Sequence, residues 1–132
     1  MQLILLYIST AVVFLGLDAV FLKNIMRPVF ETHLSDWLLD EFRIGPAAVF
    51  YLAYIAGVLF FVSWPALESG SIFGTFTKAA LLGLMAYGTY EFTNYATLDR
   101  WHPTMVAVDF IWGGVLTGVS AVAGMLITRA LT

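Results

Sequence analysis

The chain has 132 residues, of which 61% are hydrophobic and 11% charged, and its mean hydropathy is +0.89. Soluble domains are about 45–50% apolar and about 25% charged, so a soluble fold is excluded and one integral membrane domain over 1–132 is expected. The net charge of −3 argues against a nucleic-acid partner. The absence of Cys excludes disulfides and Cys-ligated metals, and no cofactor is indicated.

Four stretches have the length of about 20 mostly apolar residues that a transmembrane helix needs: 3–22, 46–67, 76–98 and 104–127. They predict an all-α fold, a four-transmembrane-helix bundle. The first stretch follows Met1-Gln2, which has no basic side chain, and no A-x-A pattern follows Asp18. We therefore expect a retained helix rather than a cleaved signal peptide.

The long connection between the first two stretches has a helical pattern of its own. Ser35 is a candidate N-cap, and Leu38, Leu39 and Phe42 form an apolar stripe. This predicts a short interfacial helix at about 35–43, with a further helical turn at 28–34. The connection is either a simple connector or a lid over a site.

The basic residues give a small bias in orientation. The connections after the first and third stretches hold four of them, against two on the opposite side: Lys23, Arg27, Arg43 and Arg100 against Lys78 and Arg129. By the positive-inside rule, we expect those connections in the cytoplasm and both termini outside.

Small residues four apart recur in the apolar stretches. Gly114 and Gly118 form a GxxxG pattern, Ala53 and Gly57 have the same spacing, and so do the residues at 79 and 83. Such spacing lets helices approach closely in lipid. It is compatible with packing inside one bundle or with a homodimer face.

Three carboxylic acids, Asp18, Glu91 and Asp109, fall inside the apolar stretches. An ionisable side chain at the centre of a membrane costs about 2.5–3.5 kcal/mol on insertion scales, and such residues usually mark function. Because the helices alternate in direction, all three acids are expected at one depth, on the side of the first and third connections. Taken singly, each could pair with a basic neighbour, favour a helix dipole or serve packing.

Other polar side chains are expected at the same depth. Tyr87, Glu91 and Asn94 share one helix face by their spacing, and Thr89 and Thr93 can bond to their own helix carbonyls. Together with the acids, the predicted ligand-binding set is Asp18, Tyr51, Tyr54, Tyr87, Glu91, Asn94, Asp109 and Trp112.

Aromatic residues near the helix ends are interpreted as interfacial anchors. These are Tyr7, Trp37, Trp64 and Trp101.

Four features of the sequence resemble the DUF2177 family, and the resemblance covers essentially the whole chain. They are the run Tyr-Gly-Thr-Tyr-Glu-Phe-Thr-Asn-Tyr-Ala-Thr-Leu at 87–98, the run Asp-Phe-Ile-Trp-Gly at 109–113, the run Phe-Tyr-Leu-Ala-Tyr at 50–54, and Asp18. The family pattern often has Asp where this chain has Glu91, so the carboxylate is kept. The resemblance implies a small bacterial inner-membrane protein with four helices. It implies no activity.

Several functions remain open at this point. The polar layer could bind a cation or a lipid-like ligand, whose anionic head the basic rim would suit. It could be the site of an enzyme acting on a lipid or isoprenoid, with Glu91 and Asp109 as acid and base and Tyr87 or Tyr51 donating a hydrogen bond. The chain could also be a proton-coupled transporter, with Asp18 as its carrier, or an accessory subunit of a membrane complex. Metal binding and oligomeric state are left undetermined.

Overall fold

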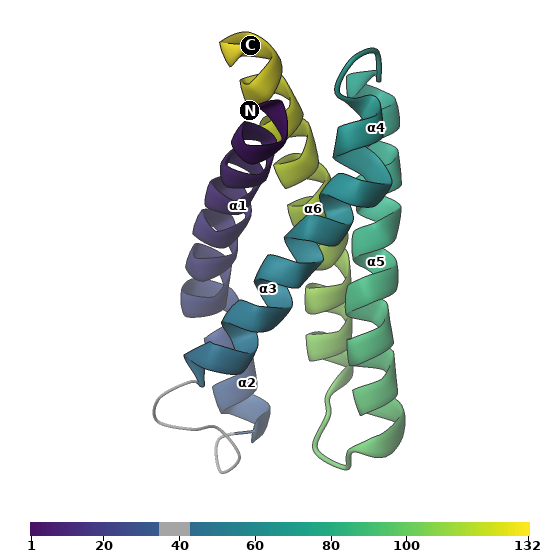
Figure 1. Ribbon diagram of the computed structural model, residues 1–132. Helices are drawn as coiled ribbons and strands as arrows, with labels where there is room; N and C mark the ends of the chain where they lie inside the picture. The colour runs from purple at the N-terminus through teal and green to yellow at the C-terminus, as the bar shows by residue number, and fades with distance from the viewer. Residues whose placement is uncertain (35–42) are drawn as a thin grey trace.

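The computed structural model describes residues 1–34 and 43–132, and every regular element in these ranges is helical. The α-helical elements are α1 (Gln2–Phe21), α2 (Arg27–Leu34), α3 (Ile44–Val58), α4 (Trp64–Ala66), α5 (Ile72–Thr97) and α6 (Pro103–Leu131), with π-helical segments η1 (Leu22–Met26) and η2 (Leu59–Ser63) between them. Since α1, η1 and α2 are continuous, as are α3, η2 and α4, these elements form four long helices in the described part of the chain (Figure 1).

Three of the long helices have the length and apolarity to cross a membrane: Gln2–Leu34, Gly45–Ala66 and Pro103–Leu131. The exposed surface is rich in large apolar side chains on all four helices, among them Val12, Phe60, Met85 and Ile111, each more than 60% exposed. A surface of this kind is stable in lipid and would aggregate in water. The predicted all-α membrane fold is therefore confirmed in its class.

The helices are arranged around α6. Helix α5 runs antiparallel beside α6, α1 packs on another face of α6, and α3 crosses the bundle obliquely (Figure 1). Both termini lie at one end, where Gln2 Nε2 donates to Thr132 Oγ1 at 3.3 Å. Helix α2 and the connection between α5 and α6 lie at the opposite end (Figure 1).

The contact between α5 and α6 depends on glycine. A Cβ on Gly83 would overlap the carbonyl oxygen of Gly113, and a Cβ on Gly113 would overlap the ring of Tyr87. Gly114 and Gly118 meet α5 side chains in the same way. We call the four glycines at 83, 113, 114 and 118 the α5–α6 seam. The GxxxG pattern thus serves packing inside the chain, whereas Gly57 of the second small-residue pair faces open space.

Each π-helical segment is followed closely by a proline. Pro28 comes two residues after η1, and Pro65 comes two residues after η2. Proline has no N–H, and its ring clashes with the carbonyl four residues earlier in an α-helix. In both places that carbonyl belongs to the π-helical segment, where the wider turn accommodates the ring. The helix therefore continues past the proline.

The boundaries differ from the sequence expectation mainly in the first helix. The helix runs on past the predicted span 3–22, through η1 and α2 to Leu34, and the helical turn predicted at 28–34 is confirmed as part of it. At about 1.5 Å per residue this helix is longer than the hydrocarbon core of a bilayer is thick. The predicted interfacial helix at 35–43 and the anchor Trp37 fall on residues outside the described ranges, apart from Arg43, which is not helical.

Candidate functional site

A cavity of about 680 Å³ lies at the end of the bundle that holds α2. Figure 1 shows α3 and α5 well separated at this end and close together near α4. The lining comes from five parts of the chain: α1 with η1, α2, α3, α5 and α6. Its residues are Asp18, Leu22, Met26, Phe30, Pro46, Ala47, Phe50, Tyr51, Ala86, Tyr87, Thr89, Tyr90 and Asp109.

Two of the three membrane carboxylic acids line this cavity. Asp18 comes from α1 and Asp109 from α6, and both side chains are largely buried. Trp112 Nε1 donates to Asp18 Oδ1 at 3.1 Å, and the Trp112 ring stacks on Phe21 with centroids 4.3 Å apart. Asp18 is therefore held in place by an indole that is itself locked by stacking.

Glu91, the third acid, lies behind the cavity rather than on its surface. Its side chain is fully buried, and its Oε1 accepts a hydrogen bond from Trp101 Nε1 at 2.9 Å. Its carboxyl interacts with that of Asp109, which also interacts electrostatically with Asp18. The other oxygen, Oε2, is buried without a well-formed hydrogen bond. The three acids thus form one group, with Asp109 in the middle.

Tyrosine hydroxyls surround the acids. The Tyr51 hydroxyl lies beside Asp18, and the Tyr87 hydroxyl is buried and has no hydrogen-bond partner among the described residues. A buried hydroxyl without a partner costs about 1–3 kcal/mol. A ligand in the cavity could supply the missing partner for Tyr87.

At this end of the bundle, α2 packs on the start of α6. Leu34, Trp101 and Met105 form a buried cluster, with Phe30 packed against it. His33 of α2 stacks on His102, the N-cap of α6, with ring centroids 4.0 Å apart. These contacts fix α2 beside the cavity, to whose lining it contributes Phe30.

The predicted site residues divide into two groups. Asp18, Tyr51, Tyr87 and Asp109 line the cavity, and the structure brings them together. The other four predicted residues do not line it: Tyr54, Glu91, Asn94 and Trp112.

All four of these residues still contact a lining residue or a helix that carries one. Glu91 and Trp112 contact the acids directly, whereas Tyr54 hydrogen-bonds Thr117 at 2.8 Å and so links α3 to α6. Asn94 contacts the Tyr90 hydroxyl.

Sequence reasoning missed much of the lining. Phe30, Phe50, Ala86 and Tyr90 line the cavity but are not among the site residues predicted from the sequence. Thr89 does bond its own helix, donating to Met85 O at 2.7 Å as expected, but it also lines the cavity. Among these residues, Tyr90 could have been identified from the sequence, because it is adjacent to Glu91 and lies in the run at 87–98 that resembles the family.

The interpretation of Trp101 as an interfacial anchor is wrong. Its side chain is only 7% exposed and its indole N–H is bonded to Glu91. Trp64, by contrast, is 45% exposed near the end of the second long helix, as an anchor would be. Tyr7 donates its hydroxyl to the carbonyl of Leu52 at 2.8 Å, which ties α1 to α3.

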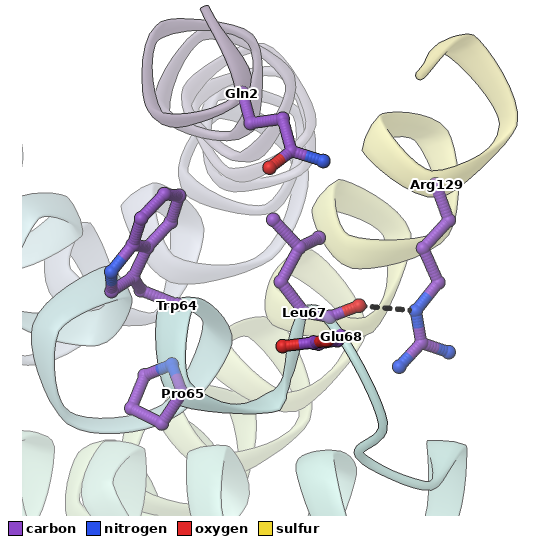
Figure 2. Close-up of a pocket in the computed structure, with 6 residues that line it drawn as sticks. All are labelled: Gln2, Trp64, Pro65, Leu67, Glu68 and Arg129. Carbon is purple, nitrogen blue, oxygen red and sulfur yellow. Dashed lines mark hydrogen bonds between the residues drawn. The ribbon is translucent and has the colours of Figure 1, made fainter.

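A second hollow, of about 510 Å³, lies at the end that holds the termini. Figure 2 shows Arg129 turned toward the carbonyl of Leu67, with Gln2 and Trp64 across the hollow. The guanidinium donates to three carbonyls, those of Ala66, Leu67 and Gly70, at 2.7–2.9 Å. Arg129 thus caps the C-terminus of the second long helix, a structural role.

Within the ranges that the structure describes, no group of three or more His, Asp or Glu side chains is arranged to hold a metal ion. The fold and the apolar surface define an integral membrane protein with several long helices. A family model described as "Predicted membrane protein (DUF2177)" matches residues 3–126, so the chain belongs to the DUF2177 family. No curated protein and no solved structure matches it.

Proposed function

We propose that the protein binds a lipid-like amphiphile inside the membrane, in the cavity between α3 and α5. The observation that carries this proposal is the division of the cavity lining. Asp18, Asp109 and the tyrosine hydroxyls lie together, and the other walls are mostly apolar. Its volume lies within the range of about 300–1,000 Å³ that is typical of small-molecule sites.

The proposal includes a topology in which all four long helices cross the bilayer. Helix α5 has 26 residues, enough to span the hydrocarbon core at about 1.5 Å per residue. It lies antiparallel along α6, which is itself a candidate span, and a short connection joins the two. In a single domain over 1–132, the cavity then opens near the cytoplasmic face of a bacterial inner membrane, with both termini outside.

Mass spectrometry of the molecules that purify with the protein tests the binding proposal. Ala86→Phe places a ring in the cavity, whereas Ala53→Phe places the same ring on an exposed part of α3 outside the lining. We expect a defined amphiphile to purify with the wild type and with Ala53→Phe, and to be lost from Ala86→Phe. Equal amounts of bound lipid in all three proteins would contradict the proposal.

One observation favours a second candidate, an enzyme that acts on the bound amphiphile. Glu91 and Asp109 are adjacent carboxyls, one sealed behind the cavity and one on its surface. Neighbouring carboxyl groups in different surroundings can serve as acid and base, and Tyr87 could donate a hydrogen bond to a substrate. In this proposal, Asp109 exchanges the proton with the substrate and Glu91 supports it from behind.

Comparison of the ligands bound to wild type and to Glu91→Gln separates binding from catalysis. The amide of the variant keeps an acceptor for Trp101 but removes the carboxyl that supports Asp109. An enzyme would carry product in the wild type and accumulate substrate in the variant. Recovery of the same molecule from both proteins would exclude the catalytic proposal and leave the binding proposal standing.

A further inference from the structure

The ionisable acid and base side chains in the described cavity lining are all acids. Among the described residues, the lining contains two carboxyl side chains, Asp18 and Asp109, and no Lys, Arg or His. A phosphate or carboxylate head brought into this space would face acids without a cationic partner in the lining, and burial of an unpaired charge is costly. The basic residues noted in the sequence, such as Lys23, are not part of the lining.

Aromatic rings add a second preference for positive charge. The lining includes five of them, Phe30, Phe50, Tyr51, Tyr87 and Tyr90. The faces of aromatic rings attract cations, and groups of such rings recognise quaternary ammonium compounds. The Phe50 and Tyr51 rings lie 5.6 Å apart between centroids, so two of these rings already form one wall of the cavity.

The acids are also held so that their position does not depend on a ligand. Trp112 bonds Asp18 from one side, and Glu91 contacts Asp109 from behind. Both supporting residues lie outside the lining. A cationic head would therefore meet two carboxyl groups that are already oriented toward the cavity, which lowers the cost of ordering them on binding.

We propose that the cavity selects amphiphiles with a positively charged amine or quaternary ammonium head over amphiphiles with an anionic head. This inference rests on the proposed binding function and specifies its ligand class. The head lies between Asp18 and Asp109 against the tyrosine rings, and the chain follows the apolar wall of Leu22, Met26 and Ala86. The anionic lipid head considered from the sequence is disfavoured here.

Calorimetric titration of the purified full-length protein in maltoside micelles tests this inference. The probes are octyltrimethylammonium, octyl phosphate and tetramethylammonium. We expect octyltrimethylammonium to bind and octyl phosphate to bind at least about tenfold more weakly, because the anionic head of octyl phosphate would face Asp18 and Asp109 without a cationic partner in the lining. Tetramethylammonium, which lacks a chain, should bind more weakly than octyltrimethylammonium and so separate a lipid-like ligand from a free organic cation.

The matched variants are Asp109→Asn and Glu68→Gln. Glu68 is an exposed acid at the opposite end of the bundle, outside this cavity, so its variant should bind like wild type, whereas Asp109→Asn should lose about tenfold in affinity for octyltrimethylammonium. The comparison of probes on wild type stands even if Asp109→Asn does not fold.

Stronger binding of octyl phosphate than of octyltrimethylammonium, blocked by Ala86→Phe, would overturn the charge selectivity and leave the amphiphile proposal intact. Binding of none of the probes, together with no ligand lost from Ala86→Phe, would overturn both. Equal binding of the two tailed probes would likewise overturn the selectivity alone.

Discussion

The α5–α6 seam and the cavity between α3 and α5 differ in how closely their helices pack, although both belong to one small bundle. At the seam, glycines bring two backbones so close that an added Cβ would overlap a carbonyl or a ring. At the cavity, α3 diverges from α5, and bulky Phe and Tyr side chains line a space of about 680 Å³. Helix α5 takes part in both regions.

The difference shows how four helices can enclose a site without losing their association. In lipid, helices associate through close packing and internal hydrogen bonds rather than through a hydrophobic drive. The seam concentrates this packing on one pair of helices. The remaining helices can then stand apart around Asp18 and Asp109, so the rigid seam and the open cavity depend on each other.

Overpacking the seam should have the largest effect on stability. Gly113→Val would drive a branched side chain into the ring of Tyr87, and we expect a loss of about 3 kcal/mol or more in the free energy of unfolding. Unfolding in mixed dodecyl sulfate and maltoside micelles, followed by circular dichroism, measures it. Gly57→Val is the control, because a Cβ at that position would meet no atom within 4 Å beyond its chain neighbours and the backbone of its own helix. Equal losses in both would mean that the seam is not the tight region.

Removal of the Arg129 cap should have the next largest effect. Arg129→Met keeps the aliphatic stem but leaves the carbonyls of Ala66, Leu67 and Gly70 without their charged donor. We expect a loss of about 2 kcal/mol in the same unfolding assay, with ligand binding in the cavity unchanged. Lys78→Met removes a charge from an exposed position of α5 and should change little. A matching loss in Lys78→Met would assign the effect to charge rather than to the cap.

A smaller effect on stability is expected from Trp112, which holds the lining residue Asp18 but lies outside the lining itself. Trp112→Phe keeps an aromatic ring to stack on Phe21 but removes the N–H that donates to Asp18. We expect a loss of about 1 kcal/mol in stability and a clearly weaker affinity for octyltrimethylammonium, because Asp18 is no longer held. Unchanged affinity, measured by calorimetry, would show that Trp112 does not position this carboxyl.

Filling the cavity should have the smallest effect on stability. Ala86→Leu adds volume where the lining is open rather than packed, so we expect a change within about 1 kcal/mol, together with loss of bound amphiphile. The same assay that detects the Gly113→Val defect measures it. A destabilisation as large as that of Gly113→Val would show that this space is closed in the folded protein and would remove the contrast between the two regions.

Much of the architecture follows from hydropathy, because a helix in lipid must be apolar over a fixed length. The alternating direction of successive helices then predicted that Asp18, Glu91 and Asp109 would lie at one end, and they lie together there. The internal use of Gly114 and Gly118 was one of two interpretations, and only the position of α5 beside them decided it.

The sequence could not supply the rotation of each helix about its own axis or the distances between side chains on different helices. Depth alone does not tell which carboxyl faces a cavity, so the sequence does not show that Asp109 lines the cavity and Glu91 lies behind it. Trp101 stands near a helix end, where an anchor is common, yet it turns inward to bond Glu91. Apolar length ends the first stretch before Lys23, so hydropathy does not show that the helix continues to the turn predicted at 28–34, and the η1 turn that joins them has no clear mark in the sequence.

The η1 turn has a consequence for the angular phase of the first long helix. A residue advances an α-helix by about 100°, so the wider turn at Leu22–Met26 changes the angle at which every later residue points. Phe30 and His33 meet the cavity and His102 in this shifted phase. If the turn tightened to α-helical spacing, both side chains would rotate away from those contacts. The five residues of η1 therefore determine which face of α2 is turned toward the acids.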